Sequence, residues 1–131
     1  MTPTLEIGDM VFDDWYGASG YFGSCLDNGG GGVLVYGAEV ADWAGLDLPN
    51  TRLALSLNGT FVKEGFGRAA MGHPLTSLTW LVNWASANGR AVATGEIVST
   101  GTCTGHCFVA PGDEVSLDVE GLGVVEARFE A

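Results

Sequence analysis

The sequence predicts an α+β fold that is mainly β, with a single long helix. In residues 74–89, apolar side chains recur at intervals of three and four, the spacing that lays one apolar stripe along a helix. In residues 51–57, leucines alternate with other residues, as is typical of a half-buried strand, and Asn58-Gly59 directly afterwards is a strong hairpin signal. The 21 glycines indicate tight turns and close approach of backbones elsewhere.

The first part of the chain contains two short expected strands. Residues 4–7 form the first, and residues 33–36, Val-Leu-Val-Tyr, form a strand embedded among glycines. The aromatic, glycine-rich connection over residues 12–22 gives no clear secondary-structure signal. Residues 43–49 are expected to form a loop before the leucine-rich strand, and residues 60–64 are the returning arm of its hairpin.

The expected helix spans residues 72–89. Pro74 suits its first turn, where the missing N–H removes no hydrogen bond, and Gly89 suits the residue after its end. Its apolar stripe, which we expect to face the core, consists of Leu75, Leu78, Leu81, Val82 and Ala85. Trp80 and Trp84 lie one turn apart on a neighbouring face, and we expect them in the core or in a subunit interface.

The last part of the chain again has β character. Residues 95–101 are predicted to form a short strand between glycine breaks, and this strand leads into a loop of small residues. Pro-Gly-Asp at residues 111–113 predicts a turn, and residues 114–119 and 124–129 predict a terminal hairpin. No internal repeat or linker interrupts the sequence, so we expect residues 1–131 to form one domain.

Composition limits the partners and the compartment that we expect. The 131 residues carry 5 basic and 16 acidic side chains, a net charge of −11, which repels nucleic acids and anionic membranes. We therefore expect no nucleic-acid partner and no membrane association. No apolar run approaches the roughly 20 residues that span a bilayer, and the N-terminus lacks a signal peptide's basic start. Three cysteines do not form a disulfide framework, so we expect a cytoplasmic protein with free thiols.

Nine short motifs occur in order along the whole chain. They are Leu5-Glu6, Asp14-Trp15, Asp27-Asn28, Gly65-x-Gly67, Gly72-His73-Pro74-Leu75, Trp80-Leu81, Gly95-Glu96-Ile97-Val98-x-Thr100-Gly101, Pro111-Gly112-Asp113 and Leu122-Gly123. Each motif alone is weak, but the whole series at compatible spacing is specific. Together they resemble the fumarylacetoacetate hydrolase superfamily, and within it the branch of 2-keto-4-pentenoate hydratases and 4-oxalocrotonate decarboxylases.

This resemblance implies a fold and a metal site. The implied fold is a mixed β-barrel or β-roll, with one helix packed outside and a divalent-metal site at the barrel mouth. In such enzymes the metal holds a 2-oxo acid, and Glu6 is the residue that matches the family's metal ligand on this strand. The implied cofactor is Mg²⁺ or Mn²⁺, because hard oxygen ligands suit these ions. The alternative for Glu6 is a strand-end side chain that faces solvent.

Two departures from the family pattern affect this site. The family's other metal carboxylates form a Glu-x-Glu pair well upstream of the Glu6 strand, and this sequence contains no counterpart. Val11 replaces a family arginine that would bind a substrate carboxylate. We therefore expect the chain to correspond to the C-terminal half of its relatives. The missing ligands would come from another chain, in a homo-oligomer or in a hetero-oligomer with a chain that carries the other half.

Three further groups of residues are candidates for catalysis or substrate contact. Asp27 and Asn28 precede glycines whose backbone N–H groups can face a ligand, and the alternative is an Asx turn into the next strand. Lys63, the single lysine, suits carboxylate binding or proton transfer, although lysines on a hairpin arm mostly face solvent. The resemblance implies that the Thr100-Gly101-Thr102 segment, in the family's Thr-Gly loop, contacts the substrate.

The two histidines have less specific signals. We expect His73 at the start of the helix, where its imidazole can cap free N–H groups. His106 lies between Cys103 and Cys107, a pattern that would suit zinc. Structural zinc needs a full tetrahedral set of ligands, and Cys25 is isolated from this segment. The sequence therefore favours substrate contact over zinc binding for this loop.

Two functions from different classes remain open. The first, which we favour, is a hydratase-type or decarboxylase-type lyase subunit that acts on a 2-oxo acid or related enolisable compound, with a metal stabilising the enolate. The second is a metal-free binding or cyclase module, or a non-catalytic partner subunit, built on the same fold. One carboxylate alone cannot hold a hard divalent ion against its hydration shell, which favours the second.

Overall fold

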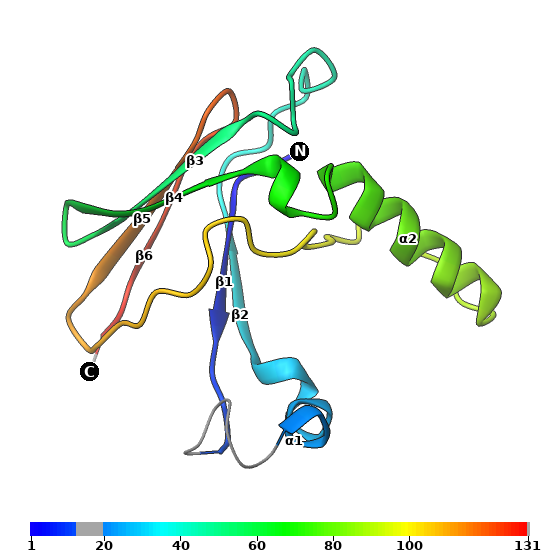
Figure 1. Cartoon of the computed structure of the whole chain (residues 1–131), viewed down its shortest axis with the longest axis horizontal. Helices are drawn as coiled ribbons and strands as arrows, with labels where there is room; N and C mark the ends of the chain where they lie inside the picture. Colours follow the sequence, from blue (N-terminus) through cyan, green and yellow to red (C-terminus); the bar gives the residue numbers. More distant parts are fainter. Residues whose placement is uncertain (13–19, 131) are drawn as a thin grey trace.

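The computed structural model describes residues 1–12 and 20–130 as two antiparallel sheets with two α-helices (Figure 1). The α+β class with dominant β structure is therefore confirmed. The closed mixed barrel is not found among the described residues, where every strand pair is antiparallel and neither sheet closes. The two-stranded sheet packs against the last strand of the four-stranded sheet without joining its hydrogen-bond ladder, so the barrel stays open.

The smaller sheet pairs β1 (Thr4–Gly8) with β2 (Gly31–Tyr36). Alternation along β1 buries Leu5, which is 8% exposed, and leaves the next side chain, Glu6, exposed on the other face. The connection between the two strands ends in α1 (Gly20–Leu26) and a 3-10 turn (Asn28–Gly30). The Asp14-Trp15 motif lies outside the described residues.

The larger sheet has the strand order β4-β3-β5-β6. Its strands are β3 (Arg52–Leu57), β4 (Thr60–Phe66), β5 (Glu114–Val119) and β6 (Gly123–Arg128). Both predicted hairpins are confirmed. Asn58 and Gly59 have φ values of 51° and 74°, the left-handed conformation that a type I′ turn requires at both central positions.

The core lies on the inner face of the larger sheet. Alternate residues of β5 point inward, and they pack with Leu5 from β1. The buried cluster consists of Leu5, Leu55, Val115, Leu117, Val119, Leu122 and Val125. This cluster joins the two sheets, and it forms the apolar floor beneath the residues discussed below.

Close packing against neighbouring backbone requires both glycines of the Gly65-x-Gly67 motif. A Cβ at Gly65 would lie 2.0 Å from the carbonyl oxygen of Cys103, and a Cβ at Gly67 would lie 2.0 Å from the carbonyl oxygen of Leu48. Real Cβ atoms do not approach backbone so closely, so only glycine permits these two contacts. The first contact brings the loop that follows residue 100 against β4.

The predicted long helix is confirmed as α2 (Pro74–Ala87). His73 is its N-cap, and its Nδ1 accepts the Leu75 N–H at 3.1 Å. Gly89, at φ 70°, follows the C-cap residue Asn88. The start and end of this helix therefore follow from residues within or next to it, as the sequence predicted.

The burial predicted for α2 is wrong. Of its 14 residues, Ala85 alone is buried, and the helix projects away from both sheets (Figure 1). Trp80 and Trp84 are 56% and 47% exposed, and their rings stack with centroids 6.5 Å apart. The tryptophans therefore lie outside the core. No helix in the described part of the chain has the length and apolar character to cross a bilayer.

The strand predicted for residues 95–101 is also wrong. This segment has no regular secondary structure, and it runs back from α2 past β1 (Figure 1, yellow). Gly95 and Gly101 have φ values of 91° and 104°, which take both ends out of the extended conformation. The Glu96 carboxylate accepts the Ala93 N–H at 2.8 Å, a local turn contact that replaces strand pairing.

Candidate functional site

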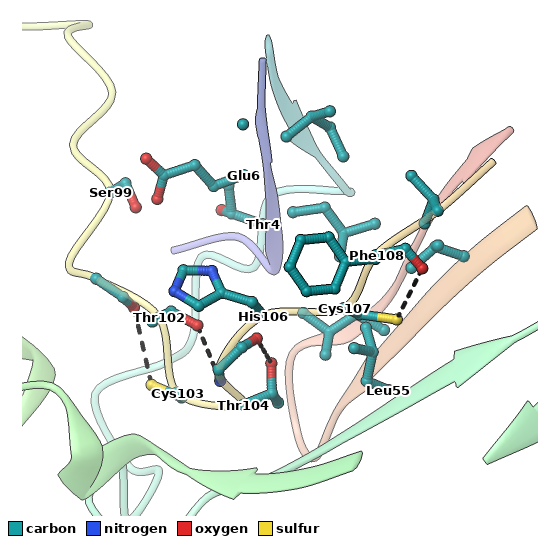
Figure 2. Close-up of a pocket in the computed structure, with 18 of the residues that line it drawn as sticks. Thr4, Glu6, Leu55, Ser99, Thr102, Cys103, Thr104, His106, Cys107 and Phe108 are labelled. Carbon is teal, nitrogen blue, oxygen red and sulfur yellow. Dashed lines mark hydrogen bonds between the residues drawn. The ribbon is translucent and has the colours of Figure 1, made fainter. Parts of the chain in front are cut away.

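An open cavity of about 450 Å³ lies between β1, the loop at residues 101–109 and the inner face of the larger sheet. Its volume lies within the range of small-molecule sites. The sheet contributes an apolar wall of four side chains, Leu53, Leu55, Val115 and Leu117. Figure 2 shows Glu6, Ser99, Thr102 and His106 around one side of the space, with Leu55 and Phe108 on the other. The cavity therefore has a polar side and an apolar side.

Strand β1 supplies the carboxylate of the polar side. Leu5 packs in the core, whereas the neighbouring Glu6 is exposed on the other face of β1, and both residues border the cavity. Glu6 is the single carboxylate among the described lining residues. Glu6 is exposed, as in the solvent-facing alternative, and its side chain also borders a concave surface.

The loop at residues 101–109 supplies most of the other polar groups. The Gly105 N–H donates to Thr102 Oγ1 at 3.2 Å, which folds the loop back on itself. The Lys63 ammonium on β4 donates to the backbone carbonyl of His106. With the close contact between Gly65 and Cys103, strand β4 thus supports this loop at two points, and the loop presents His106 to the cavity.

The two thiols of this loop, Cys103 and Cys107, also line the cavity and are half-buried. Burial raises the pKa of the Cys103 thiol above its ordinary value, and a hydrogen bond with the Ala70 backbone offsets this in part. Cys103 is therefore a neutral thiol at physiological pH, and a thiol is a far weaker nucleophile than a thiolate. Its chemistry does not suit covalent catalysis.

The structure brings together only some of the residues predicted from the sequence. Glu6, Gly101 and Thr102 line the cavity. Thr100 faces a neighbouring apolar groove of about 960 Å³ beneath α2. Lys63 is half-buried and lies outside the lining, where it supports the loop from behind. The proposed direct role of Lys63 in catalysis is therefore not supported by its position.

Asp27 and Asn28 also lie outside the lining. Asp27 is buried, and its carboxylate accepts the Val11 N–H at 3.0 Å, while its carbonyl accepts the Gly30 N–H at 2.8 Å. Asn28 is exposed with φ 50°. The contact with Gly30 is a backbone turn, but the carboxylate binds Val11, sixteen positions upstream, and does not cap the 3-10 turn, so the side-chain contact of an Asx turn is not formed. Within this segment, Gly29 and Gly30 reach the cavity instead.

The metal implied by the resemblance needs more ligands than the described residues provide. Glu6 has the right donor chemistry, since Mg²⁺ and Mn²⁺ prefer carboxylate oxygen. Over residues 1–12 and 20–130, however, no three His, Cys, Asp or Glu side chains are grouped so that they could hold an ion. The same finding gives no support to zinc at Cys103 and Cys107. These residues alone therefore do not fit a complete metal site.

The sequence did not predict that His106 would border the cavity. The available signals were its place in the loop that the resemblance assigns to substrate contact and its glycine neighbour, Gly105. Its side chain is exposed and borders the cavity on the side of Glu6 (Figure 2). The neighbouring cysteines suggested a zinc site, whereas in the structure His106 borders the cavity on the same side as the Glu6 carboxylate.

An open α+β scaffold with one carboxylate, an imidazole and hydroxyl groups over an apolar floor forms a candidate small-molecule site. Residues 9–130 match the family described as fumarylacetoacetate (FAA) hydrolase C-terminal, and the chain belongs to this family. The match covers the motifs from Asp14-Trp15 onward, so the family predicted from the sequence is confirmed.

Several characterised proteins are similar to this chain. The 4-oxalocrotonate decarboxylase of Pseudomonas putida is 32% identical over 127 residues, which cover 97% of this chain and 47% of that protein. The 2-hydroxyhexa-2,4-dienoate hydratase of Comamonas testosteroni is 32% identical, with 98% and 48% covered. The 2-keto-4-pentenoate hydratase 1 of Dechloromonas aromatica is 30% identical, with 97% and 48% covered. The chain thus spans about half the length of these relatives.

Solved structures are also similar to this chain over about half of their own length. The 4-oxalocrotonate decarboxylase from Pseudomonas putida G7, complexed with magnesium and adipate, superposes with a TM-score of 0.87 at 31% identity. This chain is covered to 98% and that chain to 48%. The same enzyme complexed with calcium and acetate gives a TM-score of 0.85, also at 31% identity. The fold of this chain is therefore the fold of about half of that enzyme.

Proposed function

We propose that residues 1–131 act as one domain that contributes part of an active site to a hydratase-type or decarboxylase-type lyase. The substrate class is a 2-oxo acid or a related enolisable compound. The observation that carries this proposal is the position of Glu6 on the polar side of the cavity, in a chain whose matched relatives are hydratases and decarboxylases. Thr102, on the same side, supports it as a substrate contact.

Each lining group has a defined part in this proposal. The hydroxyl groups of Ser99 and Thr102 donate hydrogen bonds to the oxygens of the substrate. The apolar wall, including Leu55 and Leu117, binds the hydrocarbon part and excludes water, which strengthens every polar contact beside it. The asymmetry of the cavity thus orients a ligand that has a polar head and an apolar tail.

A divalent cation, Mg²⁺ or Mn²⁺, would supply positive charge against the negative charge that develops on an enolising substrate. Glu6 would be this chain's ligand. The remaining carboxylates would come from a companion chain or from a second copy, since the described residues do not group further metal ligands. The relative that was crystallised with magnesium and with calcium supports this assignment, and so does the hard carboxylate of Glu6.

We further propose that the chain works as an oligomer, either with itself or with a chain that carries the other half. Much apolar surface is exposed: Tyr21 and Phe22 on α1 are 87% and 84% exposed, and Trp80 and Trp84 on α2 are about half exposed. Apolar areas of this kind mark interaction surfaces. The three free thiols agree with the cytoplasmic location that we propose.

A second candidate is a metal-free binding or cyclase module, or a non-catalytic partner subunit. The single carboxylate in the described lining favours it, because one oxygen ligand does not retain a hydrated hard cation. In this case the hydroxyl groups and the apolar wall would hold the ligand by hydrogen bonds and shape alone. Glu6 would then be dispensable for binding.

Calorimetric titration with Mg²⁺ and Mn²⁺ distinguishes the two candidates. It should be carried out on the chain alone and on its assembly with any companion, using wild type and Glu6→Gln. The amide keeps the shape but is a poorer ligand for a hard dication, so most of the metal affinity of the assembly should disappear. Glu126→Gln is the control, because it removes the same charge from an exposed site on β6 that is outside the cavity.

The outcome separates the candidates clearly. Loss of metal binding in Glu6→Gln, with Glu126→Gln unchanged, supports the lyase. Equal metal binding by wild type and Glu6→Gln contradicts the role of Glu6. Turnover by a wild-type assembly that binds no metal supports the metal-free module.

A further inference from the structure

The cavity offers few groups that attract an anion. Glu6 carries a negative charge, and the chain as a whole has a net charge of −11. Neither Lys63 nor any arginine belongs to the described lining. Within that lining, His106 is the single side chain that contains nitrogen. A carboxylate that enters this cavity therefore has one side chain from which it can accept an N–H hydrogen bond.

We propose that His106 is the anion-binding residue of the cavity and takes the carboxylate of the ligand. The assignment rests on the proposed function, which makes the ligand a 2-oxo acid. Thr102 is placed to assist, because its Oγ1 already accepts the Gly105 N–H at 3.2 Å and its own hydroxyl hydrogen can donate. Hydrogen bonds to an ionised acceptor are stronger than those to a neutral acceptor, so His106 determines the preference for acids over neutral analogues.

Lys63 is the positioning residue for this group. Its ammonium donates to the backbone carbonyl of His106 and does not enter the cavity. Two residues further along β4, Gly65 contacts the carbonyl of Cys103. The strand therefore holds the loop on both sides of Gly105, and the lysine fixes the backbone from which the imidazole extends.

The test compares two ligands that differ by one carboxylate. Binding of 2-oxopentanoate and of 2-pentanone to the 131-residue chain is measured by NMR titration in the presence of EDTA, so that no metal contributes. Wild type should prefer the acid. His106→Leu should reduce that preference by about tenfold, the equivalent of one hydrogen bond to a charged group, and His106→Asn, which keeps an N–H donor, should reduce it less.

Lys63 is tested by loss and rescue. Lys63→Met should reduce the preference several-fold, and Lys63→Arg, which can still donate to the His106 carbonyl, should restore it. A residue with a purely structural role would change thermal stability without changing the ratio of the two affinities. Arg90→Leu is the control for net charge, because Arg90 is exposed and lies outside the cavity. It removes one positive charge and should leave the preference unchanged.

Three results would overturn the proposal: no preference in wild type, no binding of either ligand, or an unchanged preference in His106→Leu and His106→Asn. Failure of the proposed function gives a different pattern. Preference for the acid that depends on His106, together with no turnover by an assembly that binds metal, would leave the anion site in place and reject the lyase.

Discussion

Replacement of Gly65 by alanine tests whether strand β4 supports the cavity loop. The new Cβ would lie 2.0 Å from the Cys103 carbonyl oxygen, 2.6 Å from the carbonyl carbon and 3.1 Å from the Thr104 nitrogen. All three atoms belong to the backbone, so no side chain can rotate away. At least 1 Å of backbone displacement is needed to restore a contact of 3.0 Å, and β4 is held in place by its ladder with β3.

The expected cost of Gly65→Ala is about 3 kcal/mol in the free energy of unfolding, the upper part of the usual range for overpacking. This is a large share of a domain's stability, which is typically about 5–15 kcal/mol. Urea denaturation measures it as a lower midpoint at an unchanged slope. Gly45→Ala is the matched control, because a Cβ there meets nothing within 4 Å and Gly45 has no positive φ.

The control should be neutral or slightly stabilising, since alanine restricts the unfolded chain. If Gly65→Ala loses no more stability than Gly45→Ala, the loop does not pack against β4 as described. Where the variant still folds, displacement of the loop should also weaken the preference for 2-oxopentanoate, since Cys103 and His106 belong to the same supported segment.

Two other predictions concern titratable groups. The pKa of Asp113 is lowered, first by the side-chain hydrogen bond from Asn58 at 2.8 Å and then by the Ala110 N–H. The ionised Asp113 therefore stabilises the folded state above its unfolded pKa of about 3.9, and this stabilisation disappears as pH falls through the folded pKa. Asp113→Asn should therefore melt below wild type at pH 7 and approach it in acid, and a constant gap in melting temperature would contradict this. Burial raises the pKa of the Cys103 thiol, whereas Cys25 is exposed, so a thiol reagent at pH 7 should label Cys25 first. Mass spectrometry measures the two labelling rates, and equal rates would contradict the burial of Cys103.

The sequence by itself determined the elements that depend on neighbouring residues. The helix follows from Pro74, its apolar spacing and Gly89, all of which act within a few residues. The hairpin follows from Asn58 and Gly59, which accept left-handed backbone with little strain. The family could also be read from the sequence, because the order of short motifs is preserved along the chain.

Tertiary structure decided whether these elements are buried and what they bring together. The apolar stripe of α2 predicts a core-facing helix, yet burial depends on what packs opposite, and among the residues of α2 only Ala85 is buried. Residues 95–101 have strand composition, but they pair with no strand, and the positive φ values of Gly95 and Gly101 take both ends of the segment out of the extended conformation. Lys63 and His106 are 43 positions apart in sequence, and no local pattern reports a contact between them. Local sterics and nearby hydrogen bonds are encoded within a few residues, whereas the cavity depends on long-range packing of β4 against the loop.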